Sequence, residues 1–318
     1  MRDVPVIDLS DLAAASATVA AELDRACREL GFFVIVGHGV EGIDRLDALA
    51  REFFALGEEE KDEVSMARGG RAWRGWFPLG GELTSGVADQ KEGYYFGAEG
   101  PSDGRLLHGP NLFPARPAGL ADAVHRHMDQ MTRLGRRLVE LIEEGAGWAP
   151  DSLTRLVVDP VVLFRIFSYP PTADSGWGVA EHTDYGLLTI LHQDDLGGLE
   201  VRIGPSTDAE WLVVPPIPGA LVCNIGDMLE RATGGAYRST PHRVRNTTDA
   251  TRLSMPFFLD PGWDARVEPL ERPAPGKGAG TRWDGADPLL FEGSYGEYLS
   301  AKVAKVFPEL GADELDEG

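Results

Sequence analysis

The strongest constraint on the fold is a stretch of short, β-rich segments between Val157 and about Phe258, which alternate with turns rich in Gly, Pro and Asp. Many short strands separated by such turns are typical of a sandwich or barrel. Ahead of this stretch, apolar residues recur mostly at steps of three and four between Leu120 and Gly145, which predicts one long amphipathic helix. The sequence therefore predicts a mainly β protein with flanking helices.

The other segments are expected to surround this β-rich part. Strands are predicted at Val4 to Leu9 and Gly31 to Gly37, and helices at Asp11 to Leu30 and around Tyr295 to Phe307. A further helix and a Glu-rich turn follow the second strand through Lys61, and the chain closes with an acidic tail.

Composition narrows the class of protein. The 318 residues are 43% hydrophobic and 25% charged, and no apolar run approaches the roughly 20 residues of a membrane span. The amino terminus shows no secretory signal, so we expect a cytoplasmic protein. Lys and Arg number 30 against 51 Asp and Glu, a net charge of −21, which disfavours nucleic acid and membrane surfaces as partners. The oligomeric state stays open.

The length allows one large domain or two. We expect one compact unit in two parts: residues 1–118, an α/β region that packs on the core and covers the site, and residues 119–318, which hold the long helix, the β core at about 157–260 and the closing helix. Cys27 and Cys223 are too few for a disulfide framework and are expected to be buried as small apolar side chains.

A histidine and an aspartate stand two residues apart in "EHTDYG", directly before the apolar run from Leu187 to Leu191. On a strand, His182 and Asp184 would project from the same face. One more histidine would complete the two-histidine, one-carboxylate triad that suits Fe(II) and leaves coordination positions open. His242, in another β-rich stretch, is the candidate. Taken alone, a His-x-Asp pair could equally be a hydrogen-bonded surface pair.

The other histidines are expected to take no part in the metal site. His125 and His127 are two apart on the long helix, so they are predicted to be surface residues. His192 lies in the same β-rich region at even spacing from His182, and it could line the pocket without binding the metal.

Ten residues past His242, Arg252 and Ser254 again stand two apart on a predicted strand. The guanidinium fork can grip a carboxylate bidentately, and the serine hydroxyl can donate to the same group. This pair predicts a docking site for a small dianion. Tyr169, which ends a strand at a Pro-Pro pair, offers a phenol donor to the same acid. The alternative for Arg252 alone is an exposed strand arginine.

These motifs occur in the order and spacing of a known family. The chain resembles, over nearly its whole length, the isopenicillin N synthase-like family of Fe(II)- and 2-oxoglutarate-dependent oxygenases. The resemblance rests on His182-x-Asp184, His242, Arg252-x-Ser254, Tyr169-Pro170, and the segments "FFVIVGHGV" from Phe32, "HTDYGLLTILHQDDLGGLEV" from His182 and "GDMLERATGG" from Gly226. Four motifs in this order are highly specific.

The resemblance implies a fold and a chemistry. The fold is a double-stranded β-helix, or jelly roll, that holds the metal between its two sheets. The metal is Fe(II), bound by His182, Asp184 and His242, with 2-oxoglutarate and dioxygen as cosubstrates. Decarboxylation of 2-oxoglutarate to succinate and CO2 drives the oxidation of a C–H bond, which ends as hydroxylation, desaturation or cyclisation. The 2-oxoglutarate contacts are Arg252, Ser254 and Tyr169.

The sequence departs from the family near Tyr169, since Phe167 and Ser168 stand where the family has an asparagine and its first tyrosine. Arg165 lies on the same strand face as Phe167 and Tyr169. Arg165 is therefore a candidate contact of the cofactor site or of an acidic substrate. A structural ion pair is the alternative for this arginine.

The substrate pocket is expected from segments that cover the mouth of the jelly roll. Residues 69–119 carry many Gly and Pro residues and several aromatics, so we expect irregular structure with short ordered pieces there. The stretch from Arg71 to Tyr95, with Glu82 and Thr84, and the strand residue Phe258 are the predicted substrate contacts. The alternatives are a solvated turn for Glu82 and simple core packing for the aromatics.

Three functions fit the sequence. The first is a 2-oxoglutarate-dependent oxygenase acting on a small molecule, for example of specialised metabolism. The second is an Fe(II) oxidase of the same family that takes electrons from the substrate or from ascorbate and does not use 2-oxoglutarate. The third is a non-catalytic small-ligand binder on the same fold, which the complete set of metal ligands disfavours.

Overall fold

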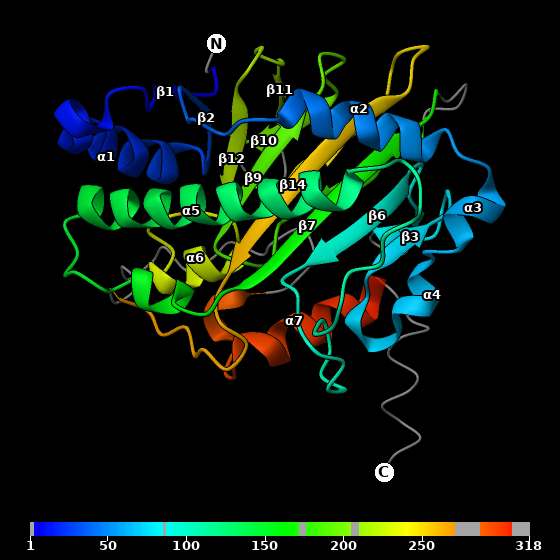
Figure 1. Ribbon diagram of the computed structural model, residues 1–318. Coiled ribbons are helices and arrows are strands. Elements are labelled where there is room, and N and C mark those ends of the chain that lie inside the picture. The colour runs from blue at the N-terminus through cyan, green and yellow to red at the C-terminus, as the bar shows by residue number, and fades with distance from the viewer. Residues whose placement is uncertain (1–2, 85–86, 172–175, 205–209, 271–286, 307–318) are drawn as a thin grey trace.

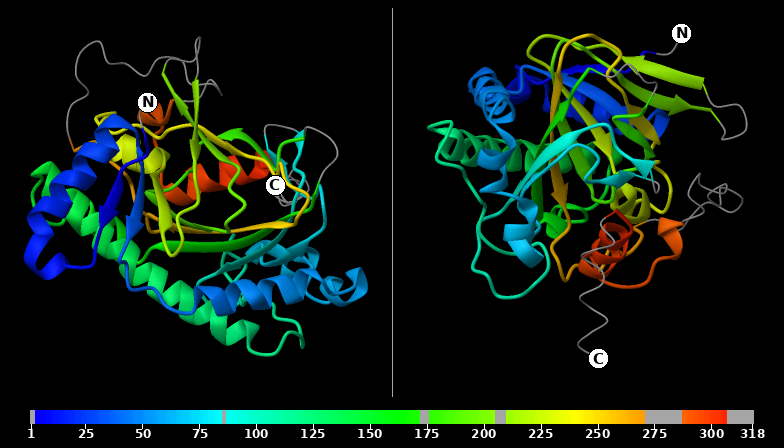
Figure 2. Two further views of the ribbon diagram at one scale, coloured as in Figure 1. Left: turned by 90° about the horizontal axis from the view of Figure 1, so that it is seen from above. Right: turned by 90° about the vertical axis from the view of Figure 1, so that its right-hand side faces the viewer.

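Two β-sheets face each other in a computed structural model, which describes residues 3–84, 87–171, 176–204, 210–270 and 287–306. Helices cover the outer face of the larger sheet (Figure 1), and the smaller sheet lies on its other side (Figure 2). This arrangement confirms the predicted mainly β fold with flanking helices and a jelly-roll core. The acidic tail and the predicted helix end at Phe307 lie outside the described residues.

The larger sheet has eight strands. In spatial order they are β1 (Val6–Asp8), β2 (Phe32–Val36), β12 (Leu221–Ile225), β9 (Leu188–Gln193), β14 (Arg252–Asp260), β7 (Val161–Tyr169), β6 (Glu92–Gly97) and β3 (Gly75–Phe77). Strands from residues 1–118 thus extend the sheet at both edges. All neighbours pair antiparallel except β1 and β2.

The smaller sheet has four strands, in the order β11 (Glu210–Val214), β10 (Leu199–Ile203), β13 (His242–Val244) and β8 (Val179–His182). A separate hairpin, β4 (Leu83–Thr84) with β5 (Val87–Ala88), contacts β8 and the last helix through β4. The neighbouring strands β13 and β8 carry the two predicted histidine ligands: His242 begins β13 and His182 ends β8, the edge strand.

Seven α-helices lie in the described residues: α1 (Leu12–Glu29), α2 (Ile43–Phe54), α3 (Glu58–Asp62), α4 (Met66–Gly69), α5 (Leu120–Ala146), α6 (Asp227–Ala232) and α7 (Tyr295–Val306). Helix α5 is the predicted amphipathic helix, and it crosses the larger sheet over β9 and β14 (Figure 1). At Gly135 a Cβ would lie 2.9 Å from a methyl carbon of Leu259, so glycine permits this close approach. None of these helices is both long and apolar enough to cross a membrane.

Strand β14 shows how the alternation of a strand divides core from cavity. Its odd-numbered residues from Leu253 to Leu259 are buried in the main apolar core under α5. Its even-numbered residues, from Arg252 to Asp260, all line the cavity between the sheets. One strand therefore presents a row of five side chains to the cavity.

Residues 69–119 hold the short ordered pieces that the sequence predicts within irregular structure. Strands β3 and β6 lie within this segment and continue the larger sheet next to β7. The alternative given for the aromatic residues, simple core packing, is confirmed for Trp76, Tyr94 and Phe96, which are all buried in the apolar core. The Gly and Pro residues around β3 and β6 interrupt the strand pattern in the sequence. The pairing of β6 with β7 joins segments that are far apart along the chain, so spacing alone does not predict it.

The prediction that His127 is a surface residue is wrong. His127 is 2% exposed and its ring centroid lies 4.9 Å from that of Phe164. Burial lowers its pKa to about 3, so the ring is neutral. The position lies three residues after Val124, on the apolar stripe of α5 that faces the sheet. His125, in contrast, pairs with Glu99 on the surface at 3.0 Å.

Both cysteines are buried and unpaired, as predicted.

Candidate metal and cosubstrate site

A cavity of about 460 Å3 lies between the two sheets. Its wall includes the even-numbered face of β14, the odd-numbered residues of β7 from Leu163 to Tyr169, and residues at the ends of β8 and β13. The volume falls in the range typical of small-molecule sites, roughly 300 to 1,000 Å3. All three predicted metal ligands and all four predicted cosubstrate contacts line this cavity.

The three predicted metal ligands converge at one point of the cavity wall. One ligand atom from each of His182, Asp184 and His242 lies within 4.8 Å of the others. The Asp184 Oδ1 atom lies 3.7 Å from Nε2 of His182 and 3.8 Å from Nε2 of His242. Two imidazoles and one carboxylate on one side of an ion leave further positions open, which is the donor set of non-haem Fe(II).

The remaining polar atoms of the triad are held by the protein. Nδ1 of His182 lies 2.8 Å from the Ala180 carbonyl, and Nδ1 of His242 lies 3.1 Å from the Thr240 carbonyl. A carbonyl can only accept, so each Nδ1 carries the proton and each Nε2 keeps its lone pair for a metal. Such outer contacts fix ring orientation and raise metal affinity.

The carboxylate of Asp184 is fixed in the same way. Its Oδ2 atom accepts hydrogen bonds from Thr189 Oγ1 at 2.5 Å and from Asn224 Nδ2 at 2.7 Å. Burial alone would raise its pKa, but the adjacent histidines and these two donors outweigh burial and lower the pKa below its usual value. Burial also lowers the pKa of His242. A charged carboxylate and a neutral imidazole are the protonation states that metal binding requires.

The prediction that His182 and Asp184 share one strand needs correction. His182 is the last residue of β8, and Asp184 lies two residues beyond the strand. The chain turns there because Asp227 N, at the start of α6, donates to the Asp184 carbonyl at 2.8 Å. At Gly186 a Cβ would lie 1.5 Å from Asp260 Oδ1, so only glycine fits the turn. The two side chains still face the same cavity.

The predicted dianion site lies along the same strand face. Arg252 is fully buried, its Nε donates to the Gly197 carbonyl, and its two terminal nitrogens have no hydrogen-bond partner in the described residues. Ser254 and Tyr169 lie beside it, with 3.2 Å between their hydroxyl oxygens. Burying a guanidinium whose terminal N–H groups have no acceptor costs free energy, unless a bound anion accepts their hydrogen bonds. The geometry therefore fits a carboxylate at this end of the cavity.

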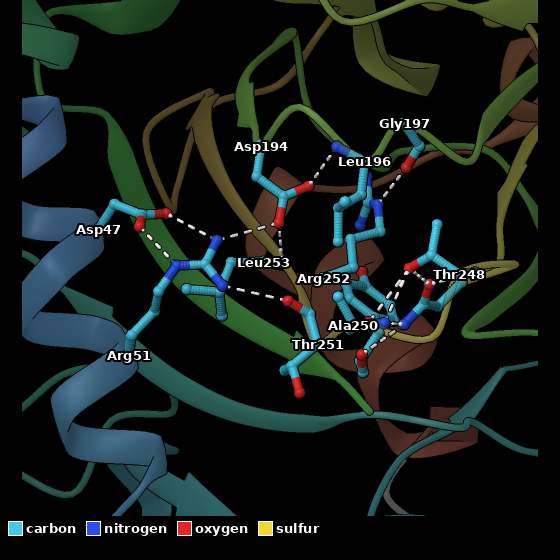
Figure 3. Close-up of polar contacts among 12 residues, drawn as sticks. Asp47, Arg51, Asp194, Leu196, Gly197, Thr248, Ala250, Thr251, Arg252 and Leu253 are labelled. Atoms are coloured by element: carbon cyan, nitrogen blue, oxygen red, sulfur yellow. Dashed lines mark hydrogen bonds and ion pairs between the residues drawn. The ribbon is translucent and has the colours of Figure 1, made fainter. Parts of the chain in front are cut away.

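A polar network behind Arg252 fixes its backbone (Figure 3). Oδ2 of Asp194 accepts a hydrogen bond from Leu253 N at 2.6 Å and pairs with Arg51 of α2 at 3.1 Å. Arg51 also donates to the Thr251 carbonyl at 3.1 Å. The residues on both sides of Arg252 are thus tied to α2 and to the turn after β9.

Arg165 and the predicted substrate contacts gather at another part of the cavity. Nη1 of Arg165 donates to the Tyr95 hydroxyl at 2.9 Å and lies 3.7 Å from Glu82 Oε1. Its guanidinium lies 4.0 Å from the Tyr95 ring centroid and 5.2 Å from that of Phe258. Glu82, Thr84 and Phe258 all line the cavity. Glu82 is 6% exposed, so the alternative of a solvated turn is wrong.

The sequence reasoning missed Lys91. This lysine is 1% exposed and lines the cavity, with its Nζ 2.8 Å from Glu82 Oε2 and in contact with Asp89. The Asp89-x-Lys91 spacing was an available signal, because both residues could share a strand face within the predicted cover. Asn224 and Thr189 were missed as well, since only tertiary structure brings them to Asp184.

His192 does not line the cavity. Thr189 and Leu191 of β9 do, and His192 points to the opposite face of the sheet because strand side chains alternate. Its even spacing from His182 carried no information, since the two residues lie on different strands.

The chain is also similar to known proteins over most of its length. Residues 4–116 match the model of the non-haem dioxygenase N-terminal region, described from morphine synthesis, and residues 159–261 match that of the 2OG-Fe(II) oxygenase superfamily. A probable iron/ascorbate oxidoreductase of Dictyostelium discoideum is 43% identical, over 92% of this chain and 90% of its own length. A 1-aminocyclopropane-1-carboxylate oxidase of Dictyostelium mucoroides is 33% identical, over 97% and 96%.

Among solved structures, a putative 2OG-Fe(II) oxygenase family protein of Caulobacter crescentus superposes with a TM-score of 0.80 at 28% identity, covering 96% of this chain and 99% of its own. Iron and 2-oxoglutarate are the metal and cosubstrate of this family, and the residues of the cavity fit both. The third predicted function, a non-catalytic small-ligand binder, is set aside because the relatives of this chain are oxidoreductases. The chain belongs to the 2OG-Fe(II) oxygenase superfamily.

Proposed function

We propose that this protein is an Fe(II)- and 2-oxoglutarate-dependent dioxygenase that oxidises a C–H bond of a small molecule and releases succinate and CO2. The observation that carries the proposal is the buried, unmatched fork of Arg252 in the same cavity as His182, Asp184 and His242. The two terminal nitrogens of this guanidinium have no hydrogen-bond partner among the described residues. A dicarboxylic acid that reaches from the metal to Arg252 would satisfy it.

In this proposal each group has one task. His182, Asp184 and His242 would hold the iron, which, when bound, supplies the activation of dioxygen. Arg252 would bind the distal carboxylate of 2-oxoglutarate, Ser254 and Tyr169 would donate hydroxyl hydrogen bonds to it, and the apolar wall around them would keep water away from the charged contact.

The substrate would lie beside the metal without binding to it. Glu82, Thr84 and Phe258, which line the cavity away from Arg252, are the proposed contacts that orient the substrate. The products would be succinate, CO2 and the oxidised substrate.

The test is single turnover with succinate as the measured product. Protein loaded anaerobically with Fe(II) and 2-oxoglutarate should release succinate when dioxygen and candidate substrates are admitted. Arg252→Ala should raise the 2-oxoglutarate concentration needed for half-maximal rate steeply, because losing a buried charge-assisted contact costs about 2 to 5 kcal/mol. Iron binding should be nearly unchanged in this variant. An unchanged response to 2-oxoglutarate would place the cosubstrate elsewhere.

A second candidate is an Fe(II) oxidase that needs no 2-oxoglutarate and draws electrons from its substrate or from ascorbate. The names of the two Dictyostelium relatives favour it, since one is called an iron/ascorbate oxidoreductase and the other an oxidase. The two candidates differ in one measurement. Substrate oxidation sustained by ascorbate without 2-oxoglutarate, and without succinate, would support the oxidase.

A further inference from the structure

The cavity is more basic than the rest of the protein. Among the described residues that line it, five Lys and Arg side chains (Lys91, Arg165, Arg252, Lys302 and Lys305) stand against three Asp and Glu side chains (Glu82, Asp184 and Asp260). The whole chain has the reverse balance, with 30 basic and 51 acidic residues. A basic cavity in an acidic protein concentrates anions at the site and away from the remaining surface.

We infer that the substrate carries a carboxylate group and that Arg165 binds this carboxylate. The inference rests on the proposed function, because the same cavity must also hold iron and 2-oxoglutarate. Arg165 and Arg252 would then recognise two different acids in one cavity.

The position of Arg165 separates it from the Arg252 end of the cavity. Tyr169 pairs with Arg252, and Phe167 pairs with Ser254, in the β7–β14 register. Arg165 precedes Tyr169 by four residues on β7, a separation of about 13 Å along a strand. The Arg165 guanidinium also lies 5.2 Å from the ring of Phe258, which pairs with Leu163 on the side away from Arg252, so the two arginines serve different parts of the cavity.

Arg165 has hydrogen-bonding capacity that the protein does not use. Its one hydrogen bond goes from Nη1 to the Tyr95 hydroxyl, while Nε is buried with no partner in the described residues. The nearest carboxylate oxygen, on Glu82, is 3.7 Å away, and Glu82 already lies 2.8 Å from Lys91 Nζ. A guanidinium has five N–H donors, so a second acceptor is expected.

Arg165 is also the member of this charged cluster that an incoming molecule meets. The cluster consists of Glu82, Asp89, Lys91 and Arg165. The Arg165 side chain is 17% exposed, whereas those of Lys91 and Asp89 are 2% exposed and that of Glu82 is 8% exposed. The buried charges would hold the guanidinium in place, and the rings of Tyr95 and Phe258 pack around it. The fork is thus preorganised for a planar anion.

Helix α7 adds positive charge at the same cavity. Lys302 and Lys305 are three residues apart, so they lie on one face of the helix, and both line the cavity. Lys302 is placed by Asp227 at 3.7 Å and by the ring of Tyr185 at 5.4 Å. Lys305 is exposed. These lysines would draw an anionic substrate toward Arg165 from solution.

The test compares acids with their uncharged analogues. The probes are small aliphatic and aromatic carboxylic acids, among them phenylacetate and 1-aminocyclopropane-1-carboxylate, each paired with its primary amide. Binding is measured by thermal shift on protein loaded with Ni(II) and saturating 2-oxoglutarate, and succinate release is measured separately with Fe(II). The variants are Arg165→Gln, Arg165→Lys and, as a control that also removes one positive charge, Arg45→Gln, which is exposed on α2.

Wild-type and Arg45→Gln proteins should bind acids about 10- to 100-fold more tightly than the matched amides. Arg165→Gln should remove this preference while leaving 2-oxoglutarate binding nearly unchanged, and Arg165→Lys should retain part of it. The inference is overturned if no acid binds better than its amide, or if Arg165→Gln weakens 2-oxoglutarate binding as strongly as Arg252→Gln does. Absence of succinate from the wild-type protein would instead contradict the proposed function, and the binding comparison would still decide the role of Arg165.

Discussion

His182, Asp184 and His242 each use one polar atom for position and present another to the cavity. The backbone carbonyls of Ala180 and Thr240 set the two imidazole tautomers. At the scale of single residues, this pattern distinguishes the triad from a surface His-x-Asp pair, in which the two side chains would bond to each other and leave no atoms directed at an ion.

Replacing any one of the three with Ala should abolish turnover and sharply weaken Fe(II) binding, because two protein ligands hold a labile divalent ion poorly. Anaerobic titration with Fe(II) and metal analysis after gel filtration measure the loss. His125→Ala is the matched control, since His125 pairs with Glu99 on the surface and should bind iron normally. Full activity in His242→Ala would remove His242 from the metal site.

At the scale of elements, the turn after β9 joins three parts of the fold. Asp194 accepts hydrogen bonds from Leu253 N of β14 at 2.6 Å and from Leu196 N at 3.2 Å, and it pairs with Arg51 of α2 (Figure 3). The same turn supplies the Gly197 carbonyl that holds Arg252 Nε. Asp194 is therefore a positioning residue for Arg252.

Asp194→Ala should raise the 2-oxoglutarate concentration for half-maximal rate about 10-fold or more, since it leaves the buried Leu253 N–H unmatched and loosens the strand beside Arg252. Iron affinity should stay close to that of the wild-type protein, whereas general unfolding would lower the iron affinity as well. Asp195→Ala, at an exposed neighbouring position, is the control. Equal effects of both changes on iron and on 2-oxoglutarate would argue against a positioning role.

The predicted cover, Arg71 to Tyr95, is divided between two sheets. Part of it belongs to β3 and β6 of the larger sheet, and part forms β4, which contacts β8 and α7. Thr84 of β4 and Phe258 of β14 both line the cavity. Substrate contacts thus come from the cover and from the core strand together.

Glu82→Ala, Thr84→Ala and Phe258→Ala should lower substrate oxidation while sparing or raising uncoupled decarboxylation of 2-oxoglutarate, because the metal and cosubstrate contacts stay whole and only substrate orientation is lost. Succinate and oxidised product are measured side by side. If both fall in strict proportion in all three variants at unchanged metal content, these residues do not orient the substrate.

At the scale of the whole molecule, one buried acid links stability to pH. Asp260 is 3% exposed; burial raises its pKa to about 7 despite a hydrogen bond from the Tyr295 hydroxyl, and Asp184 adds to the rise while Arg165 opposes it. The folded protein therefore holds this proton more tightly than the unfolded chain, whose aspartate has a pKa of 3.8. The contribution to stability is complete below 3.8 and is lost as pH rises toward about 7.

Asp260→Asn should remove this dependence. The difference in unfolding free energy between wild type and variant should change by up to about 1.4 kcal/mol per pH unit within this window, in favour of wild type at the acid end. Urea unfolding at about pH 5 and about pH 8 measures it. A difference that does not vary with pH would mean that Asp260 is ionised in the folded protein throughout.

The sequence by itself determined the order of the elements and the identity of the converging groups. The alternation in β14 and the period of α5 are local properties, so the faces of both elements could be predicted from spacing. The four motifs from Tyr169 to Ser254 predicted the metal and dianion contacts for the same reason, since each motif lies on or beside one strand.

Only the tertiary structure decided which faces meet. It placed His127 against Phe164, turned His192 away from the cavity and brought Asn224 to Asp184. It also placed the Lys91 ion pairs beside Arg165, because β6, which begins directly after Lys91, pairs with β7, which carries Arg165. Spacing along a chain predicts the direction of a side chain within its own element, whereas its partners depend on long-range packing, which burial of the whole apolar core selects.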